Sequence, residues 1–148
     1  MTLLLRIAEH IHGHLGWLTV AALLHPAIVL RNPKRRARLS VVLAAGFVAL
    51  TWALGAAIYP EYRARLKQHL FIEAPRMGWM FERKEHLAVG VAIFALIGTI
   101  AHLSAPAFDD DGTRAVMSRL AHRCFVIAAA VAILVGALGV SVAVIRSF

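Results

Sequence analysis

Eight histidines in a chain of 148 residues are the side chains whose types and spacing could do chemistry. His14 and His25 lie in one apolar run. On a helix, the eleven steps of about 100° between them end about 20° past three full turns. The two imidazoles therefore share one helix face, about 16 Å apart along the axis. Neutral imidazole binds haem iron, zinc and copper, so a bound cofactor is one hypothesis for this face.

Membrane helices must position these histidines, because 60% of the residues are apolar, far above the share usual in soluble domains. Apolar stretches lie at 15–30, 39–59, 87–103 and 124–145. Lipid offers no hydrogen-bonding water, so each stretch must be a helix. The sequence predicts an all-α, integral membrane four-helix bundle, with residues 1–148 as one domain and both termini on the same side. The helices are expected at about 3–30, 39–59, 82–103 and 120–146, with an interfacial amphipathic segment at about 61–74.

The charged residues suggest an orientation. Five of the eight residues from Arg31 to Arg38 are basic, and a short basic loop between two spans is typical of the cytoplasmic side. We therefore expect a bacterial inner (cytoplasmic) membrane location, with this loop in the cytoplasm and the termini outside. The net charge of +8 flanks the apolar stretches, so lipid headgroups are the expected partner and nucleic acid is not. The acidic run at 109–111 is expected to be a solvated turn.

In this topology the histidines form two layers at different depths, and axial haem ligation needs imidazoles from two helices at similar depth. The layer near the basic loop holds His25, His102 and His122, and the other holds His10, His12, His14, His69 and His86. His25 matches His102 or His122 in depth, and His14 or His10 matches His86. Of the three N-terminal histidines, His10, His12 and His14, the first two are expected to meet water or headgroups.

In topology and histidine placement the chain resembles the small four-helix membrane b-type cytochromes, in which histidines from different helices clamp one or two haems. The resemblance implies one or two haem b groups, single-electron transfer, and a partner such as a quinone or another subunit of a respiratory or redox complex. The cofactor-binding residues it implies are His14, His25, His86, His102 and His122, with His14, His25, His86 and His102 as haem-iron ligands. The chain departs from the pattern because His86 and His102 point about 160° apart on a helix and because 39–59 contains no histidine.

Two alternatives stay open. A non-haem metal site in the outer layer could use His10, Glu82 and Glu85, since carboxylate and imidazole ligands suit zinc, copper or iron. Alternatively, the chain is a cofactor-free accessory or scaffold subunit whose histidines are interior or interfacial polar groups. No hydrolytic or transferase motif is found, so we expect an electron carrier or an accessory subunit and not an enzyme.

Overall fold

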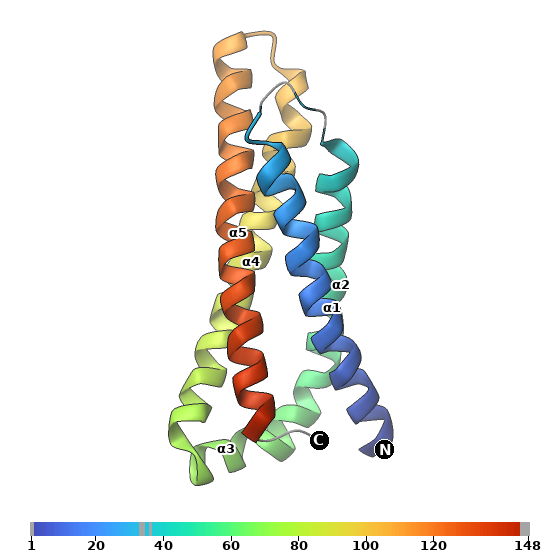
Figure 1. Ribbon diagram of the computed structural model, residues 1–148, viewed down its shortest axis with the longest axis vertical. Helices are drawn as coiled ribbons and strands as arrows, with labels where there is room; N and C mark the ends of the chain where they lie inside the picture. The colour runs from blue at the N-terminus through green and yellow to red at the C-terminus, as the bar shows by residue number, and fades with distance from the viewer. Residues whose placement is uncertain (1, 33–34, 36, 146–148) are drawn as a thin grey trace.

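The chain is helical almost throughout in the computed structural model, which describes residues 2–32, 35 and 37–145 (Figure 1). The elements are α1 (Thr2–Val29), α2 (Arg38–Tyr62), the π-helical turn η1 (Arg63–Lys67), α3 (Gln68–Glu73), α4 (Pro75–Ser104), the 3-10 turn η2 (Ala105–Ala107) and α5 (Asp111–Ile145). Within these ranges there is no strand. The all-α prediction with four long helices is confirmed.

The four long helices form an antiparallel bundle. α1 packs against α2 and α5, and α4 packs against the same two helices, so α1 and α4 lie diagonally across the bundle. α1 and α4 end at one end of the bundle, here called the loop end (Figure 1). α3 lies at the opposite end, here called the α3 end, where α1 begins and α5 finishes. The first and last described helices, α1 and α5, therefore begin and end at the same end of the bundle, which agrees with the predicted even number of crossings.

Small residues let the helices approach closely. A Cβ atom added to Gly98 of α4 would lie 3.1 Å from the Cβ of Cys124 and 3.1 Å from the ring of Phe125 on α5. A side chain at this position would need space that α5 already occupies. Close approach through small residues is how membrane helices gain packing energy, since lipid gives them no hydrophobic drive to associate. The almost fully buried alanines of the core are Ala44, Ala95, Ala121 and Ala128.

Two threonines join α1 to α2 inside this apolar core. The Thr19 hydroxyl donates to the carbonyl oxygen of Leu15 at 2.8 Å and lies 2.6 Å from the hydroxyl of Thr51. Thr19 is 5% exposed, and a buried hydroxyl must be hydrogen-bonded to avoid a desolvation cost. These bonds fix the height and rotation of α1 relative to α2.

The helices extend beyond the ranges predicted from apolar residues alone. α2 continues past residue 59, through Pro60 and η1, into α3, so the segment expected at 61–74 is a continuation of that helix. α4 begins at Pro75 instead of 82, because proline is favoured in the first turn of a helix, where its missing N–H has no intrahelical partner. The predicted bounds follow the apolar stretches, and hydropathy does not detect the polar residues at the helix ends, so the observed helices are longer.

Three helical segments are long and apolar enough to cross a membrane: Arg38–Glu73, Pro75–Ala107 and Asp111–Val144. The sequence predicted four spans, and α1 does not belong to this set. Four of its 28 residues are histidines, which lower its mean hydropathy.

Two parts of the sequence prediction fall outside the described residues. The basic loop at 31–38 contains Pro33, Lys34 and Arg36, which are not described. The predicted end of the last helix at 146 is also outside the described range. The charge density of this loop is therefore known from the sequence and not from the structure.

Asp110 caps the N-terminus of α5. Its Oδ2 accepts a hydrogen bond of 2.6 Å from the backbone N–H of Thr113, and its carbonyl oxygen accepts the first helical bond, from the N–H of Arg114. Hydrogen bonds from the Thr113 side chain and backbone, and from the backbone N–H of Gly112, hold the pKa of Asp110 below its ordinary value. The acidic run expected to be only a solvated turn thus starts the helix at Asp111 and not at 120.

Replacing Asp110 with alanine should lower the thermal unfolding temperature at neutral pH. An aspartate whose pKa is depressed in the folded state stabilises that state above its ordinary pKa of about 3.9, and the stabilisation is lost as pH falls through the lower folded-state pKa. Circular dichroism in detergent should show the gap between wild type and Asp110→Ala closing as pH falls from about 5 to about 2. Asp109→Ala removes the same charge but leaves the cap intact and should have little effect. A gap that does not depend on pH would contradict the assignment.

Candidate functional site

His14 and His25 share one face of α1, and this face points away from the bundle. Both residues are exposed, whereas Thr19, Leu23 and Pro26 on the opposite face are buried. The predicted common face is therefore consistent with the structure. Among the described residues neither imidazole has a hydrogen-bond partner. Their surroundings on α1 are exposed and mostly apolar, including Leu18 and Ile28 at 55% and 70%.

Among the three N-terminal histidines, His10, His12 and His14, it is His12 that points into the bundle. Its ring packs against Gly55 of α2: a Cβ added to that glycine would lie 2.9 Å from the His12 Cε1. The Nδ1 of His12 is buried and has no hydrogen-bond partner within the described part of the chain. The expectation that His12 meets water or headgroups is wrong, because the absence of a side chain at Gly55 leaves space that the His12 imidazole occupies. His10, in contrast, is exposed, and its Nδ1 lies 2.7 Å from the carbonyl oxygen of Arg6.

The histidines of α4 point to different sides, as their spacing predicts. His86 is exposed, and its Nδ1 lies 2.7 Å from the carbonyl oxygen of Glu82, so Nδ1–H donates and Nε2 stays free. His102 is half-buried near the loop end. Metal-binding histidines commonly make a hydrogen bond like that of His86 from Nδ1–H, and this bond orients the ring and sets its tautomer. His86 shares this feature but faces outward.

His102 and His122 lie at similar heights on α4 and α5. Gly98 meets Cys124 across the two helices. His102 is four residues beyond that contact and His122 is two, about 6 Å and 3 Å along the respective axes. His122 is half-buried, and its Nδ1 is buried without a partner in the described ranges. The close contact at Gly98 leaves little separation between α4 and α5 one turn away, so a porphyrin would not fit between them there.

The bundle does not bring the depth-matched histidines together in one interior pair. His14 and His25 face outward from α1, and His86 is exposed on α4, which lies diagonally opposite. The part of the chain that is described also holds no group of three or more His, Cys, Asp or Glu side chains that could bind a metal ion. A metal ion or haem bound to the α1 face would therefore need further coordinating groups from outside this chain.

A half-buried charged network lies at the α3 end. The Lys67 ammonium group lies 2.6 Å from Glu82 Oε1 and 3.4 Å from Glu85 Oε2. The Tyr59 hydroxyl accepts from Lys67 at 3.3 Å and donates to Glu85 at 3.5 Å. Tyr62 stacks on Phe81 beside the network, with ring centroids 4.6 Å apart. The two glutamates considered as metal ligands with His10 are thus both paired with one lysine.

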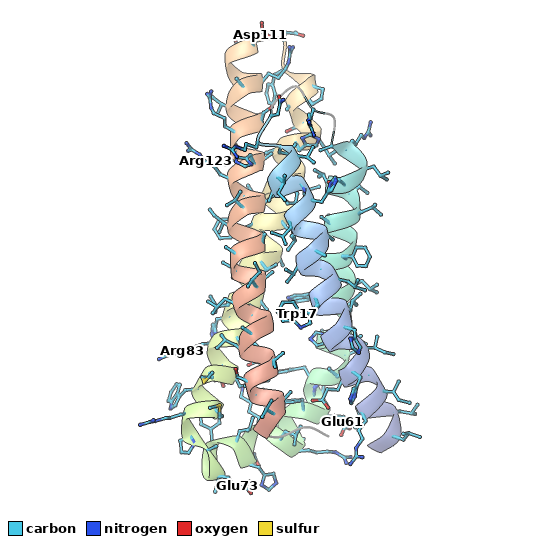
Figure 2. All side chains as sticks on the ribbon, in the orientation of Figure 1. Trp17, Glu61, Glu73, Arg83, Asp111 and Arg123 are labelled. Carbon is cyan, nitrogen blue, oxygen red and sulfur yellow. The ribbon has the colours of Figure 1, made fainter. Side chains whose placement is uncertain are left out.

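Sequence reasoning missed Lys67 and Tyr59 as partners of these glutamates. The residues come from separate helical segments, and only the reversal of the chain between α3 and α4 brings Lys67 to Glu82 and Glu85. The available signal was the amphipathic pattern of this segment, in which Lys67 directly follows Leu66 on the apolar face. Figure 2 shows Glu61 and Glu73 of the same segment at this end of the bundle, and Trp17 projecting from α1 near α5.

Lys67→Met should destabilise the fold more than Arg65→Met. The Lys67 side chain is 15% exposed, and its loss removes the ammonium group that pairs directly with two half-buried carboxylates, at a cost of about 1–3 kcal/mol in unfolding free energy. Arg65 pairs with Glu61 on the surface, where such a pair contributes about 0–1 kcal/mol. Chemical unfolding in detergent micelles measures both. Adding Glu82→Gln to Lys67→Met should restore part of the loss, and equal effects of the two single variants would contradict the network.

Comparisons of the chain with protein-family models, curated proteins and solved structures gave no match. The structure itself contains two chemically distinct candidate sites. One is the exposed α1 face, which presents imidazoles at two depths among apolar side chains. The other is the charged network at the α3 end, which is already paired internally.

Proposed function

We propose that this chain is an integral membrane protein that binds haem b through the outward histidines of α1 and passes single electrons within a larger membrane redox assembly. The observation that carries the proposal is the placement of His14 and His25 on one exposed, otherwise apolar helix face. The proposal uses the known preference of haem iron for neutral imidazole.

The membrane location is supported by the exposed apolar side chains on every long helix. Leu39, Ile100 and Val144 are 73%, 57% and 82% exposed, on α2, α4 and α5. Apolar surface of this extent is a feature of proteins covered by lipid or by partners. The basic loop at 31–38 favours the cytoplasmic side for the loop end, which leaves the charged network at the outer side of a bacterial inner membrane.

The chemistry of α1 favours a ligand over bare lipid. An exposed imidazole at hydrocarbon depth loses its hydrogen bonds to water, so it is costly unless something binds it. Coordination would satisfy the nitrogen, and the apolar side chains beside each imidazole, with the small Ala21 one turn before His25, suit a porphyrin edge. Haem, when bound, would supply one-electron redox chemistry, and the histidines of α1 would supply a ligand to its iron.

A cofactor-free accessory subunit is the second candidate. The inward histidines favour it, since His12 fills the hole at Gly55 and His102 and His122 are half-buried inside the fold. In this case the outward histidines would hydrogen-bond to a neighbouring subunit. A non-haem metal site at His10, Glu82 and Glu85 has less support, because Lys67 already pairs with both carboxylates.

Visible spectra of the protein, purified after expression with ample haem, separate these candidates. We expect a Soret band and, after dithionite reduction, the sharp bands of a six-coordinate b-type haem. His25→Ala should lower the haem content per chain at least twofold because it removes an iron ligand. His69→Ala, which removes an exposed histidine near the α3 end, is the control and should leave the spectrum unchanged. A well-expressed protein without a Soret band would favour the accessory-subunit reading.

A further inference from the structure

An open pocket that contains two arginines lies where α1 ends. It has a volume of about 470 Å³ and is at the loop end of the bundle, just before Arg38, where the long apolar segment of α2 begins. Its lining residues are Ile28, Val29, Arg31, Asn32 and Arg35. Three polar side chains and two apolar ones thus meet at the level where a membrane helix passes from acyl chains to headgroups.

Neither guanidinium group of this pocket is neutralised by the part of the chain that the structure describes. Arg31 and Arg35 are both exposed, and the ion pairs within the described ranges do not include them. The sequence has no Asp or Glu between Glu9 and Glu61, so neither the second half of α1 nor the first part of α2 supplies a carboxylate. The pocket therefore presents two positive charges to whatever enters it.

The backbone turn after α1 covers the carbonyl oxygens that would repel an anion. The last carbonyl groups of a helix carry partial negative charge, and their oxygens lack partners within the helix. Here the oxygen of Ile28 accepts a hydrogen bond of 3.3 Å from the N–H of Arg31, and that of Val29 accepts one of 3.2 Å from Asn32. The N–H of Arg35 donates to the oxygen of Asn32 at 3.1 Å. These bonds bring two arginines that are four residues apart to one pocket.

A pocket of the same volume at the α3 end has a different charge pattern. It also contains two cationic side chains, Arg63 and Lys67, but Glu82 lines it as well. The Lys67 ammonium group lies 2.6 Å from Glu82 and is also paired with Glu85. Two carboxylates thus offset the two cations at the α3 end, whereas none lines the pocket at the loop end. Guanidinium groups without a carboxylate favour a phosphate, to which arginine donates two parallel hydrogen bonds.

The apolar side of the loop-end pocket indicates that the anion carries hydrocarbon. Ile28 is 70% exposed, and Leu24, one turn earlier, is 38% exposed. An apolar surface therefore runs from the pocket along the outside of α1. A soluble anion would leave this surface uncovered. A phospholipid instead places its phosphate at the arginines and its acyl chains along the helix.

We propose that this pocket binds the headgroup of an anionic phospholipid, with the phosphate between Arg31 and Arg35 and the acyl chains along the apolar surface of α1. Phosphatidylglycerol has a phosphate and no cation, so it gains both arginine contacts. The quaternary ammonium group of phosphatidylcholine is repelled by the same arginines. The inference rests on the membrane location within the proposed function and does not use haem.

Lipid titration followed by native mass spectrometry of the detergent-purified protein tests this site. The probes are phosphatidylglycerol and phosphatidylcholine with identical acyl chains. We expect the wild type to bind the first phosphatidylglycerol about fivefold more tightly than the first phosphatidylcholine, because two arginines attract its headgroup. Arg31→Gln and Arg35→Gln should each weaken this preference, and the double variant should abolish it. Arg63→Gln, which removes an exposed arginine from the pocket at the α3 end, is the matched control and should keep it.

Equal affinity of the wild type for the two lipids, or an equal loss of preference in Arg63→Gln and in the pocket variants, would overturn the site. Displacement of phosphatidylglycerol by millimolar glycerol phosphate would overturn a lipid as the occupant and identify a site for soluble phosphates. The substituted arginines are all exposed, so the variants should keep the wild-type circular dichroism spectrum. Binding of both lipids without preference would keep the membrane location and refute the pocket. A preference in protein without a Soret band would keep the pocket and refute haem.

Discussion

The rotation of α1 about its own axis is the constraint on which the rest of the structure depends. Three contacts fix it: the His12 ring against Gly55, the Thr19 hydroxyl against Thr51, and the Trp17 ring against Gly136. Each uses a small residue or a hydroxyl that only one rotation can reach. With α1 locked in this way, the side of the helix that carries His14 and His25 cannot turn inward without breaking all three contacts.

Much of the fold could be predicted from the sequence because lipid-facing segments have few alternatives. Long apolar stretches must be helical, and short connections make neighbouring helices antiparallel, so the four long helices and the common end of the chain follow directly. The shared face of His14 and His25 follows from helix geometry alone. The direction of that face does not, because a helix that is apolar on most sides lacks the amphipathic pattern that marks the core of a soluble bundle. The direction of the face depends on contacts with other helices, among them the packing of the His12 ring against Gly55.

The charged network could not be predicted for a different reason. Glu82 and Glu85 look like ligands when only their own helix is considered, since the lysine that pairs with both of them, Lys67, lies on a separate helical segment earlier in the chain. Lys67 reaches them only because the chain reverses at Ala74, where the backbone leaves the helical conformation between α3 and α4. Interactions that depend on such a reversal require three-dimensional information, whereas the Asp110 cap, three residues from its partner, is a local signal that could have been used.

The π-helical turn at Arg63–Lys67 has a consequence for how this end of the protein tolerates insertions and deletions. A π-turn accommodates about one residue more than an α-turn, so it rotates everything after it by about 100° relative to an uninterrupted helix. Leu66 and Leu70 are buried in this rotated frame, at 7% and 1% exposure. Deleting one residue here would restore an ordinary helix and leave Leu70 and the following turn on the same face, whereas an ordinary helix of unchanged length would turn them away by about 100°. The π-turn therefore absorbs one extra residue while keeping Leu66 and Leu70 directed into the fold.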